Sequence, residues 1–530
     1  MLKKMILFPG AVLLLFGLNA IAQSPPQNWF LLDPRTDHVY GVGSERAYNE
    51  LLQGKTSTTV IVAVIDGGVD VTHEDLANNI WLNPKETPGN NIDDDGNGHP
   101  DDVNGWDFIG GPAGDVQYDQ LEITRLYKQL SDKFGQNNSA AATTGNAEYA
   151  RYLRIKHDYE IKSAESRTNY TLYQHFLSGM DDLIAATGSD NPTVEQIQNV
   201  QIADTSLRMM TAQQILISMM RDGTAATEIR DELQEGINEM KTSSEYHYNP
   251  DFNPRPIVGD NYEDITERNY GNAEVAGPDA MHGTHVAGII AADRNNNIGI
   301  KGIAENVRIL VVRCVPDGDE RDKDVGNSIR YAVEQGARVI NMSFGKGYSY
   351  NKKAVDDAIK YAMAHDVLIV HGAGNEGVNV DTAMVFPNKY FEDGGIADNY
   401  INVGATTWDS RIAGFSDFGK KNVDLFAPGV QIYSTVPGNK YRNLQGTSMS
   451  SPMVAGVAAM IRSYYPRLTA AEVREILIKS VVKVPGKVFI GSDMSDSNGK
   501  PKKAKMKKLC VSGGIVNAYN AVKLAEKKTK

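Results

Sequence analysis

Cysteine is scarce in this chain, which contains only Cys314 and Cys510 among its 530 residues. Two cysteines cannot build a thiolate metal cluster or the disulfide framework of a small secreted domain. Cys314 lies in the apolar run VRILVVRCV, where a buried thiol is expected to act as a small hydrophobic residue. We therefore favour free thiols over a bridge between these two cysteines.

The chain also lacks an excess of basic residues. Its formal net charge is −12 and its pI is near 5.4. A nucleic-acid-binding protein needs a basic face, so the composition argues against a nucleic-acid partner.

Apolar runs long enough to span a membrane are missing as well. The apolar run at the N-terminus, within MLKKMILFPGAVLLLFGLNAIAQ, is too short for such a span. Its two early lysines and its Ala20-Ile21-Ala22 end are typical of a signal peptide that is cleaved before Gln23. The sequence therefore predicts a signal peptide over residues 1–22 and a secreted or periplasmic mature protein with no integral membrane span.

What the chain does contain is an alternation of apolar runs and helical patterns. Runs rich in β-branched residues predict strands over residues 58–65, 307–315, 337–343, 366–372 and 400–405. Helical periodicity between them predicts helices over 325–335, 353–365, 450–464 and 469–480. Such an order indicates an α/β fold with a doubly wound, mostly parallel sheet.

Residues 111–255 break this alternation because they are polar and carry only helical periodicity. We interpret them as a large α-helical insertion, a cap or a lid that borders a cleft. The α/β domain then consists of residues 58–110 and 256–525, and residues 23–57 form an N-terminal extension.

Polar residues stand where three predicted strands end. Asp66 follows VIVAVI, Ser343 follows VINM, and Asn375 lies in the glycine-rich turn HGAGNEG after LIV. Ligands and chemistry collect at the carboxyl ends of strands in open parallel sheets. A carboxylate beside six apolar residues also needs a partner that offsets its desolvation. These three residues are therefore the first candidates for a site.

Histidine is the partner that Asp66 requires, and MHGTHVAGIIAA offers two. His282 falls at the expected start of a helix and can project towards the strand ends, whereas His285 lies one turn inside and is expected to be a packed structural residue. Other histidines have no comparable setting and are expected at the surface: His73, His99, His365 and His371.

Three serines crowd into LQGTSMSSPMVAG ahead of a buried helical pattern. Ser448 is predicted where the chain enters that helix, and the free amides there favour a developing oxyanion. Ser450 and Ser451 are expected to cap the helix or to face outward. We interpret Ser448 as the nucleophile.

Together these residues suit acyl transfer. His282 can take the proton of the Ser448 hydroxyl while Asp66 holds the imidazole in the required tautomer. The side-chain amide of Asn375 and the backbone amide of Ser448 can stabilise the oxyanion.

The sequence at this point resembles the subtilisin-like serine proteases. The motifs are VAVIDGGVD around Asp66, HGTHVAG around His282, INMSFG, GAGNEG around Asn375 and GTSMSSPMVAG around Ser448, in the Asp…His…Ser order of that family. The resemblance implies an exported serine endopeptidase that acts on peptide or protein substrates without a cofactor for its chemistry. It also implies a pocket for the residue before the scissile bond, lined by Ser343, Phe344, Gly345, Gly372, Ala373 and Gly374.

Three departures from the family pattern stand out. Gly67 replaces the Ser or Thr that usually follows the triad aspartate. Asp66 and His282 lie 216 positions apart because of the insertion. About 35 residues lie between the predicted signal peptide and the first predicted strand, which we expect to be too few for a separate inhibitory prodomain.

Two other functions stay open. A binding or scaffold protein could use the same fold, although such proteins are expected to lose a triad residue. A peptide ligase or transpeptidase could pass the same acyl-enzyme to an amine instead of water.

The acidic segment NIDDDGNGHPDD resembles a calcium loop. Oxygen ligands would come from Asn91, Asp93, Asp95 and Asp102, with Gly96 at the sharp turn. An acidic turn that binds no ion is the alternative interpretation. Family resemblance adds a second candidate site for structural Ca²⁺, formed by Asp75 and the loop around Asn296.

Overall fold

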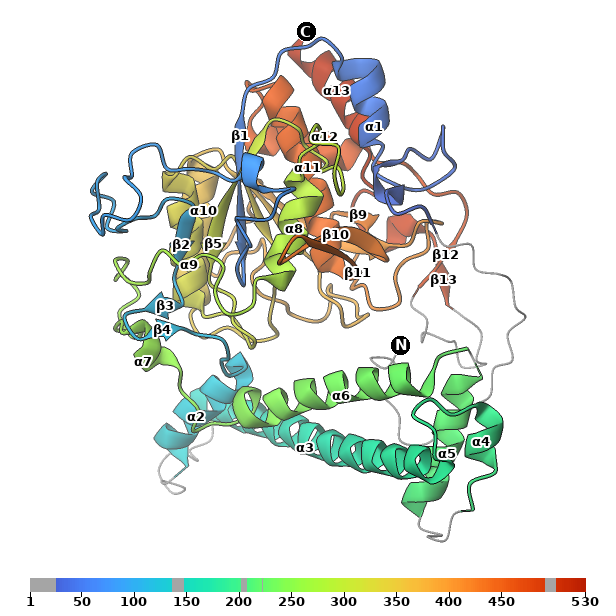
Figure 1. Ribbon diagram of the computed structural model, residues 1–530. Helices are drawn as coiled ribbons and strands as arrows, with labels where there is room; N and C mark the ends of the chain where they lie inside the picture. The colour runs from blue at the N-terminus through green and yellow to red at the C-terminus, as the bar shows by residue number, and fades with distance from the viewer. Residues whose placement is uncertain (1–24, 136–146, 202–206, 222, 491–501) are drawn as a thin grey trace. The chain divides into compact units, whose positions relative to one another are not determined.

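The computed structural model describes residues 25–135, 147–201, 207–221, 223–490 and 502–530 (Figure 1). The predicted signal peptide lies outside the described residues. Two compact units are present: an α-helical unit over residues 123–253, and an α/β unit formed by residues 23–122 and 254–530. The sequence placed the limits of the insertion at 111 and 255, and these domain limits stay a prediction.

The α/β unit is built on a seven-stranded sheet in which every pair of neighbours is parallel. The strand order is β2-β5-β1-β6-β7-β8-β9. The strands are β1 (Val60–Asp66), β2 (Gly105–Asp107), β5 (Val307–Arg313), β6 (Val339–Met342), β7 (Leu368–Gly372), β8 (Tyr400–Thr406) and β9 (Leu425–Pro428). All five predicted strands are present as β1, β5, β6, β7 and β8.

Both faces of the sheet are buried, which is why the strands read as continuous apolar runs. On β1, Val62 and Val64 pack into one core with α8 and α11, whereas Ala63 and Ile65 pack into another with α9 and α10. The helices of this unit are α1 (Ser44–Ala47), α7 (Arg255–Val258), α8 (Met281–Ala291), α9 (Asp322–Glu334), α10 (Lys352–Ala364), α11 (Thr447–Tyr464), α12 (Ala470–Lys479) and α13 (Ala518–Thr529). The α/β fold class with a doubly wound sheet is confirmed, and so are the four predicted helices.

Short antiparallel pairs decorate the same unit: β3 (Gly110–Gly111) with β4 (Gly114–Asp115), β10 (Ile432–Val436) with β11 (Lys440–Leu444), and β12 (Val488–Phe489) with β13 (Lys503–Ala504). Cys314 and Cys510 are buried free thiols, as the sequence analysis favoured. Within the described ranges, no helix is long and apolar enough to cross a membrane.

The helical unit confirms the large α-helical insertion. Its helices are α2 (Glu122–Phe134, whose first residue belongs to the α/β unit), α3 (Ala147–Thr187), α4 (Val194–Gln198), α5 (Leu207–Met220) and α6 (Ala226–Thr242). The unit has a core of its own, in which Met180, Leu183, Ile229 and Leu233 are fully buried.

Candidate active site

The carboxylate at the end of β1 and the histidine at the start of α8 are in direct contact. Nδ1 of His282 lies 2.7 Å from Oδ1 of Asp66, and the N–H of Gly67 donates to the same oxygen at 2.8 Å. The Asp66 side chain is 4% exposed, whereas that of His282 is 40% exposed. The end of β1 therefore places a buried carboxylate beside an imidazole that a ligand can still reach.

The charge of Asp66 governs the titration of this imidazole. Burial lowers the pKa of His282, but the negative charge of Asp66 and the hydrogen bond to it raise the pKa more, so that it lies above its ordinary value of 6.5. The second carboxylate oxygen, Oδ2 of Asp66, is buried, and no described residue donates a hydrogen bond to it.

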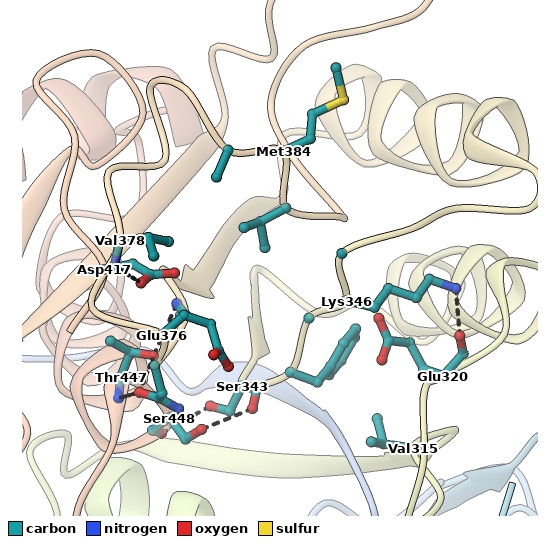
Figure 2. A pocket seen from close by; sticks show the side chains of 18 of the residues that line it. Val315, Glu320, Ser343, Lys346, Glu376, Val378, Met384, Asp417, Thr447 and Ser448 are labelled. Atoms are coloured by element: carbon teal, nitrogen blue, oxygen red, sulfur yellow. Dashed lines mark hydrogen bonds between the residues drawn. The ribbon is translucent and has the colours of Figure 1, made fainter. Parts of the chain in front are cut away.

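Ser448 is the second residue of α11, at the N-terminal end of a helix buried along most of its length. Its hydroxyl donates to the backbone carbonyl of Ser343 at 3.0 Å, and Ser343 Oγ in turn donates to the carbonyl of Ser448 at 3.0 Å (Figure 2). The structure thus ties the serine to the end of β6, next to the edge where Asp66 ends β1.

Asn375 faces the same helix terminus from the loop after β7. Its side-chain oxygen accepts from the N–H of Thr447 at 2.9 Å and from the Thr447 hydroxyl at 3.1 Å. A Cβ atom built on Gly446 would lie 3.6 Å from the Ser448 nitrogen and 3.7 Å from Asn375 Nδ2. The missing side chain leaves a space that both N–H donors border.

Two cavities meet at these residues. The first, which we call the Ser448 cavity, has a volume of about 380 Å³, and the second, which we call the His282 cavity, has about 310 Å³. Val315, Ser343 and Phe344 line both cavities. A chain segment bound along these three residues would therefore contact both the serine side and the histidine side of the site.

A family model for the subtilase family matches residues 57–508. The chain belongs to the subtilase family. The resemblance on which the sequence analysis relied is thereby confirmed.

Several subtilases are similar to parts of the chain. A thermophilic serine proteinase of Bacillus sp. (strain AK1) is 40% identical over 206 residues, which is 39% of this chain and 48% of that protein. Subtilisin DY of Bacillus licheniformis is 37% identical over 217 residues, 40% of this chain and 74% of that protein. Among solved structures, the protease domain of PatA is 26% identical with a TM-score of 0.37, covering 47% of this chain and 82% of that one. The match to the thermophilic proteinase thus spans about half of its length.

Most of the expected pocket residues of this subtilase do line a cavity. Ser343, Phe344, Gly345, Gly372 and Gly374 line the Ser448 cavity, but Ala373 lies outside its lining and is fully buried in the apolar core behind it. Two residues of the cavity wall were not predicted from the sequence: Thr447, which donates to Asn375, and Asp417, a buried acid. Thr447 could have been suspected from its place beside Ser448, whereas nothing in GFSDFG points to Asp417.

Two expectations about individual side chains were wrong. Ser450 and Ser451 neither cap the helix nor face outward, because both are fully buried. Ser450 donates to the carbonyls of Ala427 and Pro428 at 3.2 and 3.1 Å, and Ser451 is bonded to Ser343 Oγ at 2.8 Å. The buried side of α11 therefore uses serine hydroxyls to bond to the end of β9 and to Ser343 after β6.

Histidines also differ in part from expectation. His285 is packed as predicted, with Nε2 3.0 Å from the carbonyl of Ile432. The surface location expected for His73, His99 and His371 was wrong, since each is buried, while His365 is exposed. Burial lowers the pKa of His99 and of His371 to about 4, so both stay neutral in the folded protein.

The acidic loop before β2 gathers three carboxylates that fit a hard cation. Oxygens of Glu86, Asp93 and Asp95 lie within 4.8 Å of one another, a spacing that suits the oxygen coordination of calcium. Asp102 does not join them: its side chain accepts hydrogen bonds from Asn83, Asn97, Tyr331 and Gln335. Asn91 lies in the loop with φ of 56°, and its N–H donates to Asp101.

The second calcium candidate is occupied by hydrogen bonds of the protein itself. Oδ1 of Asp75 accepts from the amide of Asn296 at 2.8 Å, and Oδ2 accepts from the N–H of Ile300 at 2.9 Å and from the Tyr441 hydroxyl at 3.2 Å. Asn296 therefore presents a donor to Asp75 rather than a second oxygen ligand. Asp75 is the only carboxylate of this pair, so the second candidate offers fewer anionic ligands than the group of Glu86, Asp93 and Asp95, although that group also accepts backbone hydrogen bonds.

Proposed function

We propose that this subtilase is a serine endopeptidase that hydrolyses peptide bonds of peptide or protein substrates through an acyl-enzyme. The observation that carries the proposal is the 2.7 Å contact between His282 Nδ1 and Asp66 Oδ1 at the sheet edge where Ser448 and Asn375 also lie. In this proposal Asp66, His282 and Ser448 form the triad, and Asn375 supplies an oxyanion donor.

Acylation begins when the Ser448 hydroxyl leaves the carbonyl of Ser343 and donates to Nε2 of His282. Catalytic hydrogen bonds are often made only once substrate is bound, so the contact with Ser343 is compatible with this step. His282 takes the proton as Ser448 Oγ bonds to the carbonyl carbon, and the carbonyl π electrons move to the oxygen. That oxyanion enters the space beside Gly446, where Asn375 Nδ2 and the Ser448 N–H stabilise it.

The tetrahedral intermediate collapses when His282 gives its proton to the leaving amine and the C–N bond breaks. Water then attacks the ester while His282 takes one of its protons, and the acid product leaves as the proton returns to Ser448 Oγ. Throughout these steps, Asp66 keeps the proton on Nδ1 and stabilises the imidazolium.

The test is hydrolysis of unfolded casein by the wild type and by Ser448→Ala. We expect the alanine variant to lose nearly all activity, about 10⁶-fold in kcat by analogy with other serine triads. Ser450→Ala is the matched control, because it removes a neighbouring hydroxyl that does not face the cavities. Equal cleavage by wild type and Ser448→Ala would refute the assignment of Ser448.

Two further measurements distinguish the proposed hydrolase from the two alternative functions. Labelling of Ser448 by a fluorophosphonate distinguishes an enzyme from a binding protein on the same fold. Mass spectrometry of products formed with an added amine nucleophile distinguishes hydrolysis from ligation or transpeptidation.

We also propose that the protein is exported, to the periplasm or the medium, on the strength of the sequence over residues 1–22. N-terminal sequencing of the mature protein from those fractions tests this, with Gln23 as the expected first residue.

Calcium is proposed as a structural ion and not as a participant in the chemistry. Glu86, Asp93 and Asp95 would hold it, and its charge would offset the mutual repulsion of the three carboxylates.

A further inference from the structure

The Ser448 cavity is lined by more acidic than basic side chains. Glu320, Glu376 and Asp417 contribute carboxyl groups, while Lys346 contributes an ammonium. Figure 2 shows Asp417 and Glu376 on one side of the cavity and Glu320 on the opposite side. Carboxyl groups thus approach the same space from separate segments of the chain.

The ammonium of Lys346 is already engaged away from the cavity. Its Nζ lies 2.8 Å from Glu122 Oε2 and 2.8 Å from Asp322 Oδ1, and it donates to the carbonyl of Glu320 at 2.6 Å. Neither Glu122 nor Asp322 lines the cavity. The positive charge of Lys346 is therefore paired with Glu122 and Asp322, which do not line the cavity. It does not offset the carboxyl groups that do line the cavity.

Asp417 is the residue of this set that most clearly awaits a ligand. Its side chain is fully buried, and Oδ1 accepts from the N–H of Val378 at 2.8 Å. Oδ2 is buried with no hydrogen bond to any described residue. A Cβ on Gly374 would lie only 2.2 Å from Oδ2, so any side chain at that position would displace this oxygen from the cavity wall. A buried acceptor without a hydrogen bond destabilises the folded protein by about 1–3 kcal/mol unless a donor reaches it.

The remaining wall suits a long aliphatic chain. Val315, Phe344, Val378, Met384 and Val385 give the cavity an apolar surface beside the acids. Lysine and arginine side chains combine an aliphatic stem with a cationic head, so they match a cavity that offers both apolar and acidic surface.

We propose that the Ser448 cavity binds a lysine or arginine side chain of the substrate, on the residue whose carbonyl carbon Ser448 attacks. This inference rests on the proposed function and narrows it to cleavage after basic residues. The stem packs on the apolar wall, and the cationic head donates to Oδ2 of Asp417 and interacts with the charge of Glu376.

The titration of the buried acids agrees with this role. Burial raises the pKa of Asp417 to about 7, with a further contribution from the charge of Glu376. Burial also raises the pKa of Glu320 to about 8 against the opposing charge of Lys346. A bound cation favours the ionised form of both acids, so the cost of burying their charge is offset when the substrate arrives.

The experiment measures kcat/KM for fluorogenic peptides that differ only in the residue before the cleaved bond: Lys, Arg, Leu or Glu. We expect the Lys and Arg peptides to exceed the Leu peptide by roughly 30-fold and the Glu peptide to be the poorest. Asp417→Asn retains an oxygen for the Val378 N–H but removes the charge, so it should lower the Lys-to-Leu ratio by roughly 10-fold or more. Glu376→Gln should lower the ratio less, because Glu376 is exposed.

Glu392→Gln is the matched control, since Glu392 is exposed and outside the lining of the cavity, and we expect it to leave the ratio unchanged. Should Asp417→Asn fail to fold, Glu376→Gln still reports on the charge of the cavity. Ser448-dependent cleavage of the Leu peptide at a rate equal to or above that of the Lys and Arg peptides would overturn this inference and leave the proposed function standing. Absence of cleavage of every peptide, together with no fluorophosphonate labelling of Ser448, would refute both.

Discussion

Nδ1 of His282 lies 2.7 Å from Oδ1 of Asp66, although 216 positions separate the two residues. The contact forms because β1 ends at Asp66 and α8 begins beside that end, so the insertion between them lengthens the chain without moving the pair. Loop-closure entropy grows slowly with length, which makes such an insertion tolerable. The pair couples the charge of a buried carboxylate to an accessible imidazole.

The first prediction concerns Asp66→Asn. His282 must be neutral to accept a proton, and its pKa is raised above 6.5 because the charge of Asp66 outweighs burial. Activity of the wild type should therefore rise with pH through a midpoint above about 6.5. Asparagine removes the charge but not the burial, so the midpoint should move to lower pH, and kcat should fall about 10⁴-fold because the tautomer is no longer fixed. A pH profile of kcat/KM with an unchanged midpoint would contradict this account.

Thr447→Val tests how Asn375 is held. The valine variant loses one of the two donors to Asn375 Oδ1, and the backbone donor remains. We expect kcat to fall about 10-fold with little change in KM, against about 10²–10³-fold for Asn375→Ala. If Thr447 acts only by orienting Asn375, the double variant should be no slower than Asn375→Ala alone. A further loss in the double variant would show that Thr447 has a separate role.

The sequence predicted the elements that carry the candidate site because its signals are local. An apolar run that stops at Asp66 and a helical pattern that starts near Ser448 each place one residue at an end of an element, and parallel topology brings such ends together. The fold class followed from the same alternation of strands and helices.

The missed features depend on contacts between distant segments. Asp417 enters the cavity from the loop between β8 and β9, and Glu86 reaches the acidic loop from outside the motif of residues 91–102. Asp102 fits the spacing of a calcium loop, but its side chain accepts a hydrogen bond from Tyr331, which lies 229 positions away. Local spacing cannot reveal which partner a buried polar group will find.

The helical unit should unfold independently of the α/β unit. Leu233 is fully buried in the separate core of the helical unit, and Leu233→Ala should cost about 2–5 kcal/mol there. Hydrogen exchange followed by mass spectrometry should then show faster exchange in α3, α5 and α6 and unchanged exchange in β1, β5 and β6. The exposed neighbour Glu232→Ala is the control and should alter neither region. Equal loss of protection in both units would mean that they unfold as one.

Removal of calcium tests the acidic loop. With calcium at about 100 times its Kd, a bound ion would stabilise the fold by about 2.7 kcal/mol, so a chelator should lower Tm measurably. Glu86→Gln should abolish the effect of the chelator because it removes one of the three grouped carboxylates. Asp75→Asn should retain the effect, since Asp75 is not one of the three grouped carboxylates. A Tm that does not respond to the chelator in the wild type would favour an acidic turn without an ion.

Gly67 stands where the resemblance to the subtilisin-like proteases implies Ser or Thr. Oδ2 of Asp66 is buried without a donor among the described residues, so a hydroxyl at position 67 should stabilise the protein. The backbone at Gly67 is outside the left-handed region, but a Cβ there would lie 3.1 Å from the carbonyl oxygen of Val315, which must shift slightly. Gly67→Ala carries the same crowding without the hydroxyl, so the difference between Gly67→Ser and Gly67→Ala isolates the hydrogen bond. We expect the serine variant to exceed the alanine variant by about 1–3 kcal/mol in urea unfolding. It should also show the higher kcat, because a second hydrogen bond fixes the carboxylate that orients His282. Equal stability of the two variants would mean that the hydroxyl does not reach Oδ2.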